Sequence, residues 1–487
     1  MSQRILFAAA LCSLLGLGCQ PRDNTSPRPP DPAASTCQPA SCGPLAMIAR
    51  VCDDGSTGDP QCRRAEGGAC RWEHVCPGRT PPAATSAAPP DQPAAAEPAA
   101  GQPGAPAALP AGFVDANTTF AQRLYGRLAA AKGKLFFSPS SISTALAMTY
   151  AGARGETATQ MAKALEFKLA PEALHPAFGA LTRELTLATG EKAPELRIAN
   201  RLWGQAGMPV EAAFQETTQA HYGAGIELVD FKGASEPARG RINQWVEQQT
   251  NAKIKELLPA RSITPLTRLV LTNAVYFKGK WATPFDKQAT KDQPFTIKPG
   301  TSPSVPTMRR TLPARLGQAA DAAVLELAYE APSPERALAM VVLLPATVDG
   351  LPGVEQRLAA GQLKEYLEAL RPARVDVSLP RFTMAAEFEL SKTLAEMGMP
   401  LAFDEKKADF SGITGSDKLF ISQVRHKAFV EVNEEGTEAA AATGVVMSTR
   451  AAPAAIPVFR ADHPFVFLIR DTATGTVLFM GRVTDPR

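Results

Sequence analysis

Histidine and compact catalytic motifs are scarce in this sequence. It has five histidines among 487 residues and contains no Gly-x-Ser-x-Gly elbow, no His-Glu-x-x-His pair and no phosphate-binding loop. These absences argue against a serine hydrolase, a zinc protease and a nucleotide-dependent enzyme. We therefore expect no catalytic residues, no metal site and no cofactor, and we interpret the chain as a protein that is not an enzyme.

Blocks of like charge are also missing. The 51 Lys and Arg residues and the 48 Asp and Glu residues are well mixed, and they leave a formal net charge of +3. A nucleic-acid-binding protein would carry a dense basic patch or stripe. We therefore expect no nucleic-acid partner, and the charge balance says nothing about any other partner.

The apolar run at the amino terminus is too short for a membrane span. Residues 5–18 are 14 in number and follow the basic Arg4, whereas a spanning helix takes about 20 residues. This layout is typical of an export signal. Residues 15–19 resemble a bacterial lipoprotein cleavage box, although Gly16 stands where an aliphatic residue is usual. We expect Cys19 to carry a lipid that holds an exported protein at the cell envelope; a cleaved signal peptide followed by secretion is the alternative.

Cysteine is absent after residue 76, and six of the eight cysteines fall within 40 residues. Such density in an exported segment is typical of a disulfide-stapled module, whose 15 possible pairings stay open. A zinc site is the weaker alternative, because no Cys-x-x-Cys pair occurs and His74 is the only histidine there. Residues 53–59 look faintly like a calcium loop but lack its ligand pattern, so we interpret them as a polar turn. The six cysteines are Cys37, Cys42, Cys52, Cys62, Cys70 and Cys76.

Proline and small residues dominate the segments on both sides of this module. Residues 80–110 are almost wholly Pro, Ala, Gly and small polar residues, which cannot bury enough apolar surface to fold and predict an extended linker. We predict five parts along the chain. They are a signal peptide at 1–18, a tether at 19–36, the disulfide module at 37–76, the linker at 77–110 and a globular domain at 111–487.

The globular part mixes helical and strand patterns. Phe113, Phe120, Leu124 and Leu128 have the spacing of an amphipathic helix, and residues 239–254 predict another. Helices dominate early and strands late, which favours an α+β fold. Runs of β-branched and aromatic residues predict strands at 269–281, 338–344, 375–379, 465–469 and 477–483, the last two joined by a hairpin loop at 471–475.

A run of small residues stands out at 434–443, which reads EEGTEAAAAT. Its four alanines have no side chain that would obstruct insertion between existing strands, and Gly436 allows a sharp change of backbone direction. Alternate residues of a strand face the same side. One side would carry an uncharged set, with Glu438 on the other: Thr437, Ala439, Ala441, Thr443, Val445 and Met447.

This segment resembles the hinge of the serpins, a family of protease inhibitors whose exposed loop can become a strand. The resemblance extends from about Phe113 to Arg487, and the matching motifs occur in family order. It implies an α+β serpin fold with three β-sheets, about nine helices and an exposed reactive-centre loop, in a monomer. The matching motifs are at 136–142, 145–148, 152–157, 267–281, 424–433 and 458–469.

The resemblance also implies a reactive bond. In serpins the bond attacked by the protease lies seventeen residues along when the first hinge glutamate is counted as one, and this count reaches Arg450 from Glu434. The implied bond is Arg450–Ala451, and the implied partner is a trypsin-like serine protease. A carboxylate at the base of such a pocket pairs with an arginine guanidinium and rejects neutral residues. Met447 is the alternative, for an elastase- or subtilisin-like target. The implied hinge residues are Glu434, Gly436, Thr437, Glu438, Ala439, Ala440, Ala441 and Ala442.

Four polar residues match a cluster that controls sheet opening in the family: Ser138, Ser141, Asn273 and His426. Each alone is more often a satisfied core group, but together they imply the serpin shutter. Lys134 stands where many serpins have an asparagine, and a lysine cannot accept the same hydrogen bonds.

The resemblance leaves two functions open. The first is an irreversible suicide-substrate inhibitor that traps the acyl-enzyme by inserting its cleaved loop into the large sheet. The alternative is a non-inhibitory serpin that binds or carries another molecule. Such members usually place bulky or charged residues or proline in the hinge, whereas this chain has four alanines and no proline between Gly436 and Arg450. This difference favours the inhibitor.

Overall fold

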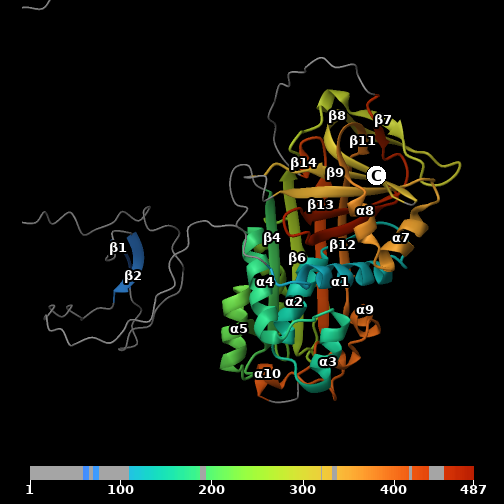
Figure 1. The fold of residues 1–487 in the computed structure, drawn as a ribbon. Coiled ribbons are helices and arrows are strands. Elements are labelled where there is room, and N and C mark those ends of the chain that lie inside the picture. The colour runs from blue at the N-terminus through green and yellow to red at the C-terminus, as the bar shows by residue number, and fades with distance from the viewer. Residues whose placement is uncertain are drawn as a thin grey trace, which may run out of the picture. The chain divides into compact units, whose positions relative to one another are not determined.

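The computed structural model describes residues 59–64, 70–75, 109–186, 194–319, 321–331, 337–415, 419–437 and 455–487. The chain divides into two compact units, Met1–Ala100 and Gly101–Arg487 (Figure 1). In the first unit, β1 (Asp59–Arg64) pairs antiparallel with β2 (Cys70–Val75), so that Cys62 lies opposite Trp72. Cys19, Cys37, Cys42, Cys52 and Cys76 lie outside the described residues, and the disulfide module stays a prediction.

Ten α-helices belong to the described part of the second unit, against about nine implied by the resemblance. None of the helices described is long and apolar enough to cross a membrane. The helices are α1 (Phe113–Leu128), α2 (Pro139–Tyr150), α3 (Gly155–Ala164), α4 (Pro171–Thr186), α5 (Ala212–Tyr222), α6 (Ser235–Gln249), α7 (Leu351–Ala359), α8 (Leu363–Glu368), α9 (Ser391–Glu396) and α10 (Ser411–Thr414).

The two helices predicted from apolar spacing are present, one with shifted ends. In α1 the predicted apolar residues are all buried. The helix predicted at 239–254 is α6, which begins earlier and ends at Gln249. It ends there because Asn251 and Ala252 have positive φ angles of 50° and 58°, which an α-helix of L-residues cannot continue through.

A six-stranded sheet carries the long central strand that the sequence predicts at 269–281. Its order is β12–β13–β6–β4–β5, and the short β14 also pairs with β6. Every residue of β6 from Leu269 to Phe277 is buried, because layers cover both faces of this sheet. Trp203 and Val270 pack toward Ile242 of α6, while the alternate strand residues face α2. The strands are β4 (Glu195–Gln205), β5 (Ile226–Val229), β6 (Leu269–Lys280), β12 (Phe382–Glu389), β13 (Gln423–Val432) and β14 (Gly436–Thr437).

The remaining described strands of this unit form one nine-stranded sheet, where the resemblance implied two separate ones. The long β8 joins them, since it pairs with β11 over Thr307–Leu316 and with β9 over Arg315–Ala319. The strand order is β15–β11–β8–β9–β10–β16–β17–β3, with β7 beside β8. The strands are β3 (Leu135–Phe137), β7 (Lys291–Pro294), β8 (Ser304–Ala319), β9 (Ala322–Ala328), β10 (Leu338–Pro345), β11 (Arg371–Pro380), β15 (Val458–Arg460), β16 (Phe465–Asp471) and β17 (Val477–Val483).

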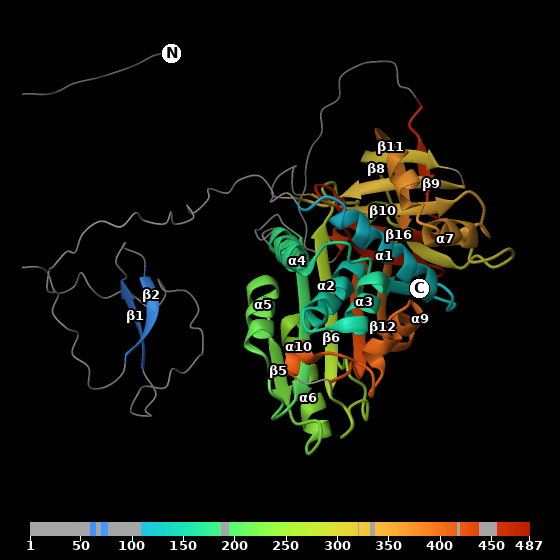
Figure 2. The ribbon, with the colours of Figure 1, turned by 60° about the horizontal axis from the view of Figure 1, so that its bottom comes forward.

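The two sheets are held together by α2 and by an aromatic core. In the sequence, α2 follows β3, and it packs against β17 of the larger sheet and against β4 and β6 of the smaller one. Phe136 of β3 stacks between Phe467 and Phe479, with ring centroids 5.7 and 5.3 Å away. Figure 1 shows β7, β8 and β11 gathered at one end of the unit, with β6 running away from them, and Figure 2 shows β8 and β11 at that end from another side. The fold class expected from the sequence, α+β, is thus confirmed.

Candidate functional site

The seam of the smaller sheet lies between β6 and β13, two parallel strands. Their register pairs Gln423 with Val270 at one end and Phe429 with Tyr276 at the other. Beyond that last pair β6 continues for four residues, and β13 continues to Val432 against β12 alone. A strand antiparallel to both neighbours can enter at this point without any change in their direction.

The hinge begins at the mouth of this seam. After β13 the chain reverses in a tight turn, where Asn433 and Gly436 exchange backbone hydrogen bonds of 2.8 and 3.2 Å. The two residues of β14 then pair antiparallel with β6, Gly436 opposite Lys280 and Thr437 opposite Gly279. The first two hinge residues after the turn are therefore already a strand of the sheet.

Gly436 is required by this geometry. Its φ is +147°, a conformation that side-chain-bearing residues rarely adopt. A Cβ atom added here would lie 2.1 Å from the carbonyl oxygen of Gly279. The pivot that the sequence predicts at Gly436 coincides with the chain reversal, although its role in insertion stays a prediction.

Thr437 faces inward, as its place in the alternating set predicts. It is fully buried, with 0% of its surface exposed, and its hydroxyl lies 3.0 Å from the hydroxyl of Tyr329. Burial raises the pKa of Tyr329, so its phenol stays protonated and can donate to Thr437. A small polar residue is satisfied at this position, whereas a charged one would be buried beside the neutral Tyr329 hydroxyl.

One buried and one half-buried carboxylate lie beside the turn, a feature that the sequence did not predict. Glu434 is 4% exposed; it accepts a 2.7 Å hydrogen bond from the Thr290 hydroxyl and lies 3.6 Å from the Arg381 guanidinium. Glu435 pairs with Lys287. Its Oε2 is buried and has no hydrogen-bond partner among the described residues. The charged groups therefore hold the hinge turn in place.

Trp281 fixes the backbone of the same turn. Its indole N–H donates to the carbonyl oxygen of Asn433 at 2.9 Å, and its backbone N–H donates to that of Glu435 at 3.0 Å. The indole stacks on Tyr329, with centroids 4.7 Å apart and planes 8° apart. The sequence interpretation placed Trp281 only at the end of a strand motif and assigned it no role. Nothing local in the sequence links it to a turn that begins 152 residues later.

The four predicted shutter residues come together across the seam. His426 of β13 lies opposite Asn273 of β6 in the register and contacts its Oδ1 through Nδ1. The Ser138 backbone N–H donates to His426 Nε2 at 3.1 Å, and Asn273 Nδ2 donates to the Ser141 hydroxyl. Burial lowers the pKa of His426 to about 3, so the imidazole is neutral. The cluster ties α2 to both sides of the seam.

Asn200 is a fifth member that the sequence interpretation missed. It lies opposite Asn273 on β4, and its Oδ1 accepts from the Ser141 hydroxyl at 3.2 Å. No recognised motif surrounds Asn200 in the sequence, so only the pairing of β4 with β6 could identify it as a member of the cluster. Lys134 lies outside the cluster, because its Nζ donates to the main-chain oxygen of Arg487.

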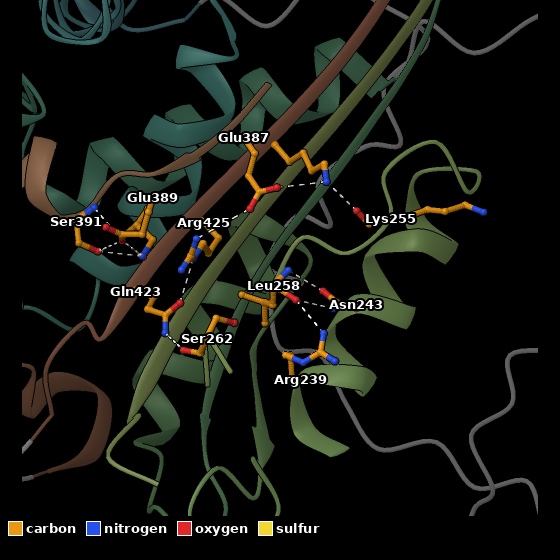
Figure 3. A network of polar contacts seen from close by, with 12 residues as sticks. Arg239, Asn243, Lys255, Leu258, Ser262, Glu387, Glu389, Ser391, Gln423 and Arg425 are labelled. Carbon is orange, nitrogen blue, oxygen red and sulfur yellow. Dashed lines mark hydrogen bonds and ion pairs between the residues drawn. The ribbon is translucent and has the colours of Figure 1, made fainter. Parts of the chain in front are cut away.

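A segment across the face of the sheet covers the seam; we call residues 250–268 the strap (Figure 3). On one side Asn243 of α6 exchanges hydrogen bonds of 2.8 and 2.9 Å with the Leu258 backbone. On the other side Lys427 of β13 donates to the Lys255 carbonyl oxygen at 2.8 Å and lies 3.3 Å from Glu387 of β12.

Two further contacts fix where the strap crosses. Gln423 of β13 donates to the Ser262 carbonyl oxygen. The ammonium of Lys253 lies 6.0 Å from the ring centroids of both Tyr276 and Phe429, the last register pair of the seam. The strap therefore bridges β6 and β13 where the hinge strand would enter.

The reactive bond and most of the hinge lie outside the described residues. They are Glu438, Ala439, Ala440, Ala441, Ala442, Met447, Arg450 and Ala451. Their assignment stays a prediction from the sequence.

Comparisons with known proteins bear on the second unit. The family model described as "Serpin (serine protease inhibitor)" matches residues 115–486. Leukocyte elastase inhibitor A of Rattus norvegicus is 42% identical over 382 residues, which cover 76% of this chain and 98% of the rat protein. The horse leukocyte elastase inhibitor is 41% identical with the same coverage.

Solved structures agree with the fold. Serpin48 of the insect Tenebrio molitor has a TM-score of 0.68 and 32% identity, covering 77% of this chain and 98% of that one. Human thyroxine-binding globulin has a TM-score of 0.68 and 31% identity with the same coverage. From its sequence, the chain is described only as not an enzyme. This description is corrected, because the matching family model gives a positive one, that of a serine protease inhibitor. The chain belongs to the serpin family.

Proposed function

We propose that this serpin is an irreversible suicide-substrate inhibitor of trypsin-like serine proteases. The observation that carries the proposal is β14: the first hinge residues are already paired with β6 at the mouth of a seam between parallel strands. The residues that follow them in the sequence are small and uncharged on the side that would face inward. Such a segment can extend the pairing that β14 begins.

The register of β14 defines what insertion would bring together. If the pairing of Thr437 with Gly279 is continued antiparallel, Ala439 meets Phe277, Ala441 meets Val275 and Thr443 meets Asn273 of the shutter. Arg450 would then lie opposite Leu266, three residues before the first residue of β6. At about 3.3 Å per residue, the thirteen steps from Thr437 to Arg450 span roughly 43 Å.

The chemistry belongs to the target protease until the bond is cut. Its serine attacks the Arg450 carbonyl carbon, the bond to the Ala451 nitrogen breaks, and an ester joins Arg450 to the protease. The freed hinge then inserts and carries the acyl group toward the far end of β6. Distortion of the protease before water reaches the ester leaves a covalent complex.

The specificity rests on Arg450. The rat and horse relatives are named for leukocyte elastase, whereas an arginine at the counted position pairs with the carboxylate of a trypsin-like pocket. A carrier is the alternative, since thyroxine-binding globulin has a similar fold. The fully buried Thr437 and the alanines after it favour an inserting hinge over a carrier.

A separate proposal concerns the amino-terminal part of the chain. The matched relatives are covered over 98% of their own length by 76% of this chain, so these comparisons bear on the second unit alone. We propose that Cys19 carries a lipid, that residues 37–76 form three disulfides, and that residues 77–110 space the serpin unit from an envelope membrane. A Cys19→Ser variant should then appear in the soluble fraction, whereas wild-type protein that is soluble and free of lipid overturns the anchor.

The experiment is electrophoresis after mixing with trypsin. Wild-type protein should give a band that survives denaturation at the combined mass of trypsin and the serpin, and mass spectrometry should place the ester at Arg450. Arg450→Ala should lower the rate of trypsin inhibition by more than a hundredfold, because the pocket carboxylate is left unpaired. An unchanged rate would move the reactive bond, with Met447 as the next candidate. Clean cleavage without a covalent band would favour the carrier.

A further inference from the structure

A charged and partly apolar face lies directly after the loop in the chain. The three strands β8, β11 and β15 put Arg309, Ser378 and Arg460 in one row, since Ser378 is the register partner of both arginines. The next row holds Asp376 and Val458, and Arg374 lies two residues further along β11. Residues opposite one another in a sheet share a face, so these side chains gather on one surface. We call these residues the arginine face.

The three carboxylates that line the groove beside this face already have hydrogen-bond partners. Arg309 holds Asp376 with two hydrogen bonds of 3.1 and 2.6 Å. Asp462 lies 2.7 Å from His463 Nδ1, and Asp286 accepts the Gln288 backbone N–H at 2.9 Å. A groove of about 810 Å³ lies among these residues.

Three cations around the same face are left over. In the described part of the chain, Lys291, Arg374 and Arg460 are exposed and make no hydrogen bond or ion pair with another side chain. Arg460 acts on Asp376 and Asp462 only through its charge. These three cationic side chains are therefore free to meet an anionic partner.

Exposed apolar surface is concentrated at the same place. Three large hydrophobic residues are exposed among the described ones, and two of them are Ile456 (47%) and Val458 (51%). Apolar anchors rimmed by arginines are typical of protein-binding surfaces. This combination of apolar and cationic groups favours a protein as the partner of the arginine face over a small anion.

The short chain separation between the arginine face and Arg450 indicates which protein would bind to this face. Val458 lies eight residues beyond Arg450, so even a fully extended chain separates them by at most about 29 Å. A protease domain of about 230 residues has a radius of gyration of about 17 Å. A protease seated on the Arg450–Ala451 bond is therefore within reach of β15.

We propose that the arginine face is a second docking surface for the target protease, which receives an acidic and partly apolar surface loop beside the protease active site. This inference rests on the proposed function and adds to it a selection among trypsin-like proteases by their surface charge. Arg450 fits the pocket that all of them share. Arg374 and Arg460 would distinguish members with an acidic rim, chiefly by raising the association rate. Val458 would add apolar contact with any member.

The test uses two probes with the same pocket and opposite surface charge, anionic and cationic trypsin. Wild-type protein should inhibit the anionic form about tenfold faster at low salt, and the advantage should shrink at high salt. The double variant Arg374→Glu/Arg460→Glu should lose that advantage while keeping its cleavage at Arg450. Val458→Ser should slow both trypsins about twofold at any salt concentration.

The matched control makes the same change of net charge elsewhere. Lys168 and Lys392 are 68% and 86% exposed along their side chains; one follows α3 and the other lies in α9, away from β8 and β11 (Figure 1). Lys168→Glu/Lys392→Glu should keep the wild-type preference. Equal rates and salt slopes for all three proteins, with covalent complexes still formed, overturn the docking surface alone. Absence of any covalent complex with wild-type protein overturns the proposed function instead.

Discussion

At the scale of single residues, the shutter depends on one neutral imidazole. His426 Nε2 accepts the Ser138 backbone N–H, so the ring proton resides on Nδ1 and points to Asn273 Oδ1. A second proton on Nε2 would face an N–H donor in a fully buried site. The protonated form therefore breaks a contact that ties β13 to α2.

The pH dependence of stability follows from that imidazole. Burial lowers the pKa of His426 to about 3 in the folded protein, while the unfolded value is about 6.5. The unfolded chain thus binds more protons between these values, and the stabilisation present above pH 6.5 is lost as the pH falls, by up to about 1.4 kcal/mol per unit. Unfolding midpoints at pH 7.5 and 5 should differ clearly.

A matched pair of variants separates His426 from His175, which is also buried and has a lowered pKa. Burial also lowers the pKa of His175, to about 4, so it contributes in the same direction. His426→Gln should reduce the pH dependence of the unfolding midpoint and change the rate of loop insertion. His175→Gln should change the slope and leave insertion alone. A wild-type slope in the His426→Gln protein contradicts the argument.

Site residues could be predicted from the sequence where they belong to a recognised motif. Ser138, Ser141, Asn273 and His426 match a known pattern, and they meet. Asn200 joins them only through the pairing of β4 with β6. The burial of Glu434 and Glu435 likewise depends on side chains from β12 and η3 (Lys287–Ala289) and their flanks, far away in the sequence. A single sequence contains no signal for such contacts.

At the scale of elements, the strap opposes separation of β6 and β13. It is fixed to α6 through Asn243 and to β13 through Lys427 and Gln423 (Figure 3). A strand that enters the seam must push these elements apart, so the contacts add to the barrier for insertion. The position of the α6 end matters here, because positive φ angles at Asn251 and Ala252 start the strap where apolar spacing predicted more helix.

Lys427→Met should lower that barrier. The change removes the charge-assisted bond to the Lys255 carbonyl and the ion pair with Glu387, while the apolar stem still packs. Since the site is partly exposed, a loss of about 1 kcal/mol is reasonable, which corresponds to roughly fivefold faster insertion. The measurement is the annealing rate of a synthetic peptide with the sequence 437–450.

Lys392→Met is the control for this measurement. Its ammonium lies 3.9 Å from Glu396 on the exposed side of α9 and touches neither the strap nor the seam. Its annealing rate should equal that of wild-type protein. If Lys427→Met also anneals at the wild-type rate, the strap contributes nothing to the barrier.

At the scale of the whole molecule, the chain comprises two units that differ in their predicted need for disulfide bonds. The second unit has two large hydrophobic clusters and contains no cysteine. A fragment that starts at Ala111 should therefore fold and inhibit trypsin at the rate of the full chain. Loss of inhibition in this fragment, with folding intact by circular dichroism, would make the first unit part of the inhibitory mechanism.

The native state itself should be metastable. Among the described residues, Gly436 and Thr437 begin a pairing of the hinge with β6, and the residues that follow them in the sequence can extend the same ladder. Full insertion gives these residues hydrogen bonds on both sides and buries their inner side chains, each methyl or methylene group contributing about 0.8 kcal/mol. A kinetic barrier, with the strap and the shutter as its visible parts, would hold the loop out of the sheet.

Cleavage of the loop should therefore raise the melting temperature, although a cut chain is normally less stable. The measurement compares intact protein with protein cut by a protease that it does not trap. Thr437→Arg is the informative variant, because a guanidinium beside Tyr329 in a fully buried site has no charged partner. This variant should be cut after Arg450, release the protease, and gain little melting temperature. If wild-type protein melts no higher after cleavage, the hinge does not insert and the chain is a non-inhibitory serpin.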